Sequence, residues 1–219
     1  NVPPTTSRTA SHQVMEPTSY GRATLSARAL TLAHSHVDTR ERAHLRSTAM
    51  SLRFGAFLAP HHLMGESPTL QLQRDLDLVE HLDRLGYDEF WCGEHHSTGW
   101  ETIASPEMFL AAAAVRTHRI GLGTGVTSIP YHHPFHVAQK IVQLDHMSRG
   151  RAILGTGPGA LPSDAHTLGI DPMVLRDRQD EAIPVIQRLL AGAERFSYES
   201  EWFTLLRNWA RWELFDDIR

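Results

Sequence analysis

From residue 52 onward, apolar positions follow two spacings that recur in a regular order. Short apolar runs of strand length begin near residues 53, 88, 120 and 151. Each run is followed by a segment whose apolar residues recur at intervals of three and four, the spacing of one helix face. A step of roughly thirty to thirty-five residues is the length of one βα unit, and right-handed crossovers between such units produce a parallel sheet. The pattern therefore predicts four successive βα units.

The ends of the expected helices carry residues that helix termini favour. Thr69 is expected to cap the first helix, which ends at Gly86. An N-cap, a first-turn proline and a first-turn acid open the second helix at Ser105-Pro106-Glu107. Pro134 opens the third helix, and the fourth is expected to be interrupted or kinked at Pro184.

The two flanking segments differ from this pattern. Residues 1–49 are rich in Ser, Thr, Arg and His and lack a sustained period, so we expect a disordered leader outside the fold. A start at Met50 is favoured over an organellar transit peptide. A short hairpin is expected from Phe196 to Thr204, and residues 206–219 form an aberrant tail without a fifth βα unit. Because a complete barrel needs about 250 residues, residues 50–205 are expected to form half a barrel or a small open sheet.

Composition narrows the class of protein further. A chain of 219 residues with 41% hydrophobic residues can bury a sizeable core. A net charge of -4 without a basic stripe argues against nucleic acid as a partner. No apolar run approaches the ~20 residues of a membrane span, so no membrane partner is expected. The single cysteine, Cys92, lies in an apolar strand, which favours a core residue over a nucleophile and fits a reducing cytoplasm.

Candidate chemistry gathers in the segments that follow the expected strands. Four such segments, 59–64, 93–100, 124–133 and 155–164, hold an unusual share of the histidine, glycine and aromatic residues. The carboxyl ends of parallel strands meet at one edge of a sheet, where ligands bind in folds of this kind. A functional site is therefore expected there.

The turn at Gly93-Glu94-His95-His96 is the sharpest of these features. Histidine exchanges a proton near neutral pH, and an adjacent carboxylate can fix its tautomer. Two alternatives stay open. The histidines can be loop residues bonded to backbone, or they can bind a metal together with further histidines. No ligand spacing matches a known metal pattern, so no metal site is expected. The further histidines considered are His61, His62, His132 and His133.

Two glycine-rich segments, 121–125 and 155–159, also follow strands. Neither keeps the spacing of the dinucleotide-binding fingerprint. Glycines at neighbouring strand ends do allow the backbone to approach a flat ligand closely. Tight barrel turns are the competing interpretation.

A series of short motifs runs along residues 54–159: Phe54-Gly55-Ala56-Phe57, Gly86-Tyr87-Asp88-Glu89-Phe90-Trp91, Glu94-His95-His96, Gly123-Thr124-Gly125, His133-Pro134, the segment 144–151 and Gly157-Pro158-Gly159. Taken in order, these motifs resemble the flavin-dependent monooxygenases of the bacterial luciferase superfamily. The segments 104–107 and 159–164 resemble in particular the branch that includes limonene monooxygenases. The resemblance implies a (β/α)8 TIM barrel, of which about the first four units are present.

The resemblance also implies an activity. Reduced FMN or FAD, supplied by a separate reductase, would react with O2 to give a flavin hydroperoxide that oxygenates a small apolar substrate. A homodimer through the second and third helices is expected. An inactive or flavin-binding remnant and a deazaflavin (F420)-dependent reductase on the same fold remain the alternatives.

Site residues follow from the same resemblance. His95 matches the active-site histidine of the family, and Glu94 beside it is assigned to the catalytic set. Gly125 and Val126 match a strand end that packs on the flavin ring, sometimes through a non-prolyl cis peptide. The remaining residues assigned to the cofactor are Phe57, Gly157 and Pro158.

Overall fold

The computed structural model describes residues 52–192 and 195–206. The chain divides into two units, Asn1–Ala49 and Met50–Arg219, and every described residue belongs to the second. The predicted leader, residues 1–49, lies outside the described residues, and so does the predicted tail, residues 206–219, except for Leu206.

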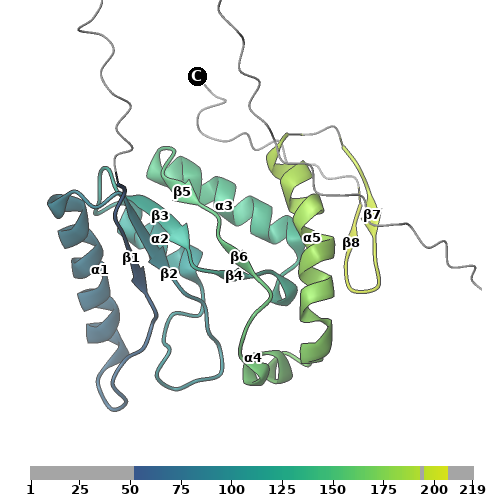
Figure 1. Ribbon diagram of the computed structural model, residues 1–219, viewed down its shortest axis with the longest axis horizontal. Coiled ribbons are helices and arrows are strands. Elements are labelled where there is room, and N and C mark those ends of the chain that lie inside the picture. The colour runs from purple at the N-terminus through teal and green to yellow at the C-terminus, as the bar shows by residue number, and fades with distance from the viewer. Residues whose placement is uncertain (1–51, 193–194, 207–219) are drawn as a thin grey trace, which may run out of the picture. The chain divides into compact units, whose positions relative to one another are not determined.

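A parallel sheet forms the centre of the second unit (Figure 1). Its strands β1 (Gly55–Leu58), β2 (Glu89–Cys92), β3 (Gly121–Thr124) and β5 (Ala152–Ile153) lie side by side in that order. All three neighbouring pairs are parallel, as the repeating βα pattern predicts. The strand order therefore follows the chain, as in one sector of a barrel.

The fourth predicted strand, 151–156, is divided in the structure. Its first part is β5, and its second part, β6 (Thr156–Gly157), pairs with β4 (Thr127–Ser128). Between the two parts, the Thr124 hydroxyl donates to the Gly155 carbonyl at 2.9 Å and accepts from the Gly155 amide at 3.1 Å. A side chain thus replaces the backbone ladder at this point, and the chain turns toward a second short sheet.

Helices cover the sheet in chain order. Helix α1 contacts α2, α2 contacts α3, and α3 contacts α5. Short 3-10 turns, η2 and η3, precede α3 and α5 respectively. The helix bounds are Pro68–Leu85 for α1, Pro106–Ala114 for α2, Pro134–Ser148 for α3, Pro162–Thr167 for α4 and Leu175–Leu190 for α5, and the 3-10 turns span Ile129–Tyr131 and Pro172–Val174.

Two predicted helix boundaries were wrong. Ser67, rather than Thr69, is the N-cap of α1, because Pro68 takes the first helical position and starts the helix two residues earlier. The fourth helix is not interrupted at Pro184: α5 is continuous through it, and α4 is a separate helix. Pro184 is exposed, so water can bond the carbonyl that loses its partner.

The main core lies between the sheet and the helices. Phe90 and Leu122 point from the strands into it and are fully buried with Val79 and Leu110 from the helices. The opposite face of the sheet carries Phe57, whose exposed fraction is 63%. In a closed barrel this face would line the interior. Phe57 is therefore an exposed apolar side chain on the face that would line a barrel.

The described residues end in the predicted hairpin, formed by β7 (Tyr198–Glu199) and β8 (Thr204–Leu205). Phe196, Phe203 and Leu205 pack with Val185 of α5 in a small core of their own. Among residues 52–192 and 195–206, no helix has the length and apolar character needed to cross a membrane.

Close packing at the strand ends predicts a large effect of a small substitution. A Cβ placed on Gly155 would lie 2.2 Å from the carbonyl oxygen of Thr124, and the backbone on both sides would have to move. We expect Gly155→Ala to lower the free energy of unfolding by about 1–3 kcal/mol, measured by urea unfolding. Gly99→Ala is the matched control because nothing lies within 4 Å of its added Cβ. Equal stability of the two variants would show that the turn relaxes freely.

Candidate functional site

Histidine and carboxylate side chains meet beyond the carboxyl end of β2. Glu94 and His95 lie in the loop that starts at Gly93, directly after the strand. The neighbouring loops after β1 and β3 and the helix α4 bring further polar groups to the same place. The sequence prediction of a site at this edge of the sheet therefore agrees with the placement of these residues.

Glu94 is the centre of a first cluster. Its side chain is buried, and its Oε2 atom accepts a hydrogen bond from the Ser128 amide at 2.6 Å. The other oxygen, Oε1, faces Nε2 of His96 at 2.8 Å and Nε2 of His132 at 2.5 Å. One carboxylate thus ties the loop after β2 to β4 and to the turn that follows it.

The charge of Glu94 is stabilised despite its burial. Burial alone would raise the pKa of Glu94, but hydrogen bonds from His132, His96 and the Ser128 amide outweigh it and lower the pKa to about 2. The hydrogen bond to Glu94 in turn raises the pKa of His96, against the smaller effect of desolvation. The cluster therefore favours the charged forms of Glu94 and of His96.

His95 makes different contacts from those expected for a histidine next to Glu94. Its Nδ1 lies 3.3 Å from Oδ2 of Asp164, and its Nε2 lies 3.4 Å from Oε1 of Glu101. Glu94 turns instead to His96, because its Oε2 is held by the Ser128 amide on β4. The carboxylates that face His95 are therefore not the adjacent one: Asp164 is distant in sequence, and Glu101 lies at the far end of the same loop.

Asp164 fastens the loop that carries His95. Its Oδ1 accepts from the amides of His96 and Ser97 at 3.2 and 2.8 Å and from the Ser97 hydroxyl at 2.5 Å. Burial would raise the pKa of Asp164, but the hydrogen bonds from Ser97, His95 and the two amides lower it overall. An ionised Asp164 on α4 thus holds the ring of His95 and the two backbone amides that follow it.

The residues assigned to the cofactor meet in two pairs. A Cβ placed on Gly125 would lie 3.0 Å from Cε2 of Phe57, and one on Gly157 would lie 2.6 Å from Cγ2 of Val126. The Gly125–Val126 peptide bond is cis. Gly157 is buried and Pro158 beside it is half-buried. Gly125 lets the Phe57 ring pack directly against the backbone, and Phe57 stays 63% exposed, which leaves its ring accessible to a flat ligand.

One buried polar atom beside this surface lacks a partner. The Tyr131 hydroxyl is enclosed without a hydrogen bond, and its ring lies edge-on to His96 at 5.8 Å between centroids. A Cβ on Gly159 would come within 2.3 Å of that hydroxyl. Buried hydroxyls normally have a partner, so Tyr131 offers a hydrogen bond to a ligand. The residues present therefore fit a planar group with polar substituents, such as a flavin.

Metal binding was the open alternative for the histidines. The ligand atoms of Glu94, His96 and His132 lie within 4.8 Å of one another. Both imidazoles, however, face the same oxygen at hydrogen-bond distance, and the other oxygen is taken by an amide. We interpret the group as a hydrogen-bonded cluster, and the other histidines considered lie elsewhere: His62 faces Asp75, and His133 caps α3.

Sequence reasoning missed several members of the site. Asp164 and Tyr131 lie inside segments expected to hold functional residues, yet nothing local assigned them a role. Glu101 lies one residue beyond such a segment. Cys92 is buried, and burial raises the pKa of its thiol, which confirms it as a core residue.

Comparison with known proteins identifies the family. The model of the luciferase-like monooxygenases matches residues 52–213. The chain is 58% identical over 154 residues to 4-hydroxyprotoasukamycin monooxygenase from Streptomyces nodosus subsp. asukaensis, covering 70% of this chain and 42% of that protein. It is 60% identical over 151 residues to limonene 1,2-monooxygenase from Rhodococcus erythropolis, covering 69% and 39%. The chain thus spans less than half the length of these relatives.

Solved structures agree with this assignment. The oxygenating constituent of 3,6-diketocamphane monooxygenase from Pseudomonas putida, a complex with FMN, superposes with a TM-score of 0.67 at 28% identity, over 71% of this chain and 43% of that one. The monooxygenase RslO1 from Streptomyces bottropensis gives a TM-score of 0.66 at 31% identity, over 74% and 52%. The fold is therefore that of a luciferase-like TIM barrel, of which the chain covers a part. On sequence and structure together, the chain belongs to the luciferase-like monooxygenase family.

Proposed function

We propose that this chain supplies the first half of the barrel of a flavin-dependent monooxygenase, with residues 50–205 as the barrel segment. The observation that carries the proposal is the joint placement of His95 and of the exposed Phe57 ring beside Gly125 at one edge of the sheet. When bound, reduced flavin supplies the electrons that activate O2. The chain's own residues bind and orient that flavin and move protons beside it.

Each group has a distinct part in this proposal. Phe57, Gly125 and Val126 provide the surface against one face of the ring, and the Tyr131 hydroxyl offers a polar contact. His95 exchanges a proton with the reacting centre, as general acid–base catalysis requires. Asp164 keeps Nδ1 of His95 occupied, so that Nε2 is the nitrogen that exchanges. Glu94 holds the loop that carries His95 in place through its hydrogen bonds with His96 and with the Ser128 amide.

Partners and substrate are inferred from the relatives. One relative, 29% identical, is named the oxygenase component of a flavin-dependent trigonelline monooxygenase. An oxygenase component needs reduced flavin from elsewhere, so we propose a separate reductase as partner. The limonene and diketocamphane monooxygenases among the relatives favour a small apolar substrate and FMN as cofactor.

A chimera tests this function. Residues 52–206 would replace the matching segment of limonene 1,2-monooxygenase, to which the chain is 60% identical. With reduced FMN from a reductase, we expect limonene-dependent O2 uptake and an oxygenated product. A chimera that folds and binds reduced flavin but forms no product would favour the remnant. Failure to bind flavin at all would contradict the proposal, and hydride transfer from a reduced deazaflavin would favour the reductase.

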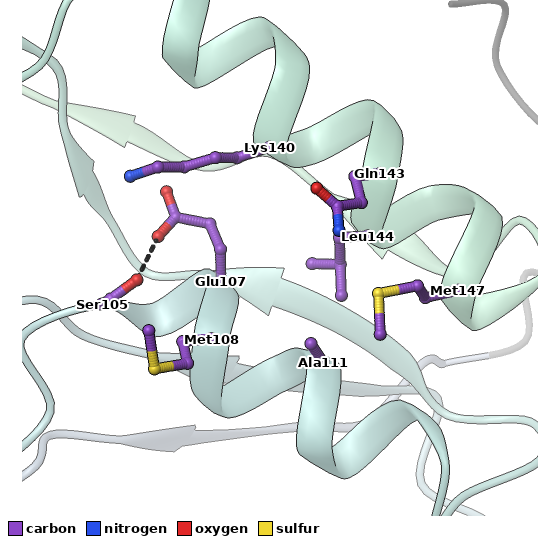
Figure 2. Close-up of a pocket in the computed structure, with 8 residues that line it drawn as sticks. All are labelled: Ser105, Glu107, Met108, Ala111, Lys140, Gln143, Leu144 and Met147. Atoms are coloured by element: carbon purple, nitrogen blue, oxygen red, sulfur yellow. Dashed lines mark hydrogen bonds between the residues drawn. The ribbon is translucent and has the colours of Figure 1, made fainter.

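A second copy of the chain is the further partner that we propose. Figure 2 shows a groove between α2 and α3, lined by Met108, Ala111, Leu144 and Met147, with Lys140 extending across Glu107 at one end. Met108 is 75% exposed and Met147 is 44% exposed. Such a stripe of apolar side chains on neighbouring helices is more than a solvent-facing surface requires. An isologous two-fold contact would bury it.

We therefore expect a dimer or larger assembly, measured by sedimentation at micromolar concentration. Ala111→Glu places a charge in the groove and is expected to shift the protein toward monomer. Met173→Glu is the matched control, because Met173 is 83% exposed on η3, outside this groove. A monomeric unaltered chain, or an equal response of both variants, would contradict the assignment of the interface.

A further inference from the structure

An alternating series of imidazoles and carboxylates runs from solvent to His95. Nε2 of His61 lies 2.8 Å from Oε1 of Glu101, and the same oxygen lies 3.4 Å from Nε2 of His95. The His61 side chain is 62% exposed, whereas that of Glu101 is 5% exposed. A buried carboxylate thus stands between a surface histidine and the candidate catalytic one.

Glu101 is arranged so that one oxygen serves both imidazoles. Its other oxygen, Oε2, accepts a hydrogen bond from the Thr98 hydroxyl at 2.5 Å. Oε1 is therefore left to His61 and His95. A proton received at Oε1 from one ring can leave for the other ring from the same atom. Glu94 is built in the same way, with its Oε2 held by Ser128 and its Oε1 shared by two histidines.

The backbone holds this series in place independently of the side chains. His61 and Glu101 form an isolated antiparallel bridge, and the His62 amide donates to the Trp100 carbonyl at 2.7 Å. At the other end, Asp164 accepts from the amides of His96 and Ser97. Side chains in the series can therefore be replaced while the loops after β1 and β2 stay together.

We propose that His61 and Glu101 form a proton path between solvent and Nε2 of His95. In the inward direction, the N–H bond at Nε2 of His61 breaks and an O–H bond forms at Oε1 of Glu101. That O–H bond then breaks as the proton bonds to Nε2 of His95, which becomes an imidazolium, and water returns a proton to His61. No electrons are transferred, and the Nδ1 proton of His95 remains with Asp164 throughout.

The path deepens the proposed function, because His95 is the group expected to exchange a proton during oxygenation. Once substrate and flavin cover the site, direct contact of His95 with water is reduced. The His61 side chain, by contrast, is 62% exposed and contacts Glu101 at 2.8 Å. Glu101 and His61 are therefore positioning and relay residues that act through His95.

The test measures the exchange of the His95 Nε2 proton with water by NMR on the full chain with FMN added to cover the site, over roughly pH 5 to 8, where histidine protons exchange. We expect His61→Ala and Glu101→Gln each to slow this exchange on the order of tenfold or more, the lower range of acid–base effects. Added imidazole should restore exchange in His61→Ala, because it can occupy the vacated position, but not in Glu101→Gln. Exchange at Nδ1 should stay unchanged.

His166→Gln is the control, since His166 is exposed on α4 and outside the series. Equal Nε2 exchange in the unaltered chain and in both relay variants would overturn the proposal, and so would loss of imidazole rescue. His61→Ala keeps the measurement informative if Glu101→Gln unfolds. The NMR result does not depend on turnover. If exchange is slowed in the two relay variants but no oxygenation is found, the proton path is supported and the proposed function is contradicted.

Discussion

Replacing His95 with alanine is expected to lower the oxygenation rate by about 10²–10⁴-fold, while the affinity for flavin stays nearly unchanged. The size follows from the loss of a positioned acid–base group. Flavin affinity should persist because the surface of Phe57, Gly125 and Val126 does not include the imidazole. Single-turnover kinetics and flavin titration of the chimera with limonene 1,2-monooxygenase measure the two quantities separately.

His96→Ala is the control for this experiment. His96 follows His95 directly, but its Nε2 faces Glu94 and not the carboxylates around His95. The His96→Ala substitution should lower the free energy of unfolding somewhat. It should lower the oxygenation rate much less than His95→Ala does. Equal rates of oxygenation for His95→Ala and the unaltered chimera would remove His95 from the chemistry, and a loss of flavin binding would make it a binding residue.

The parallel sheet could be predicted because its information is local and repeated. Each strand is a short apolar run, each helix shows its own spacing, and the step between them repeats along the chain. The errors arose where a single side chain overrides the pattern. Thr124 bonds both backbone groups of Gly155 and divides the fourth strand, which no propensity indicates. Ser67 is favoured over Thr69 only because Pro68 takes the first turn.

The position of the candidate site could be predicted from the sequence, but the hydrogen-bond partners of its residues could not. The fold rule that functional groups follow strands located the loop of Glu94 and His95. The partners of these residues depend on tertiary geometry: Asp164 is 69 positions from His95. Adjacency suggested Glu94 as the partner of His95, whereas the Ser128 amide draws Glu94 to the other side. Contacts of this kind become visible only when several βα units are assembled.

Two of the buried glutamates, Glu94 and Glu101, show how the fold uses one arrangement twice. In each, a hydroxyl or amide occupies Oε2 and two imidazoles share Oε1. They differ in access: His61 is largely exposed, whereas His96 and His132 are each 20% exposed. The Glu101 group is therefore suited to proton exchange with solvent, and the Glu94 group to holding a fixed charge and joining three segments.

That difference predicts a large loss of stability on replacing Glu94 with glutamine. The folded state lowers the pKa of Glu94 from 4.5 to about 2, and at about 1.4 kcal/mol per pKa unit this corresponds to about 3 kcal/mol. A carboxyl group whose pKa is lowered by folding stabilises the fold at pH values above its unfolded-state pKa. This contribution is lost as the pH falls from about 4.5 toward 2. Glutamine keeps the shape but removes the charge.

The raised pKa of His96 sets the opposite limit. The contribution of His96 to stability is present at pH values below its unfolded-state pKa of 6.5. It is lost as the pH rises through the pKa of His96 in the folded state. The difference in unfolding free energy between the unaltered chain and Glu94→Gln should therefore be largest between about pH 4.5 and 6.5, and smaller on either side. Urea unfolding at several pH values measures it. Glu199→Gln, at an exposed position on β7, should show a small difference that does not vary with pH. A flat profile for Glu94→Gln as well would mean that its carboxylate is held by packing alone, without the electrostatic coupling to His96 and His132.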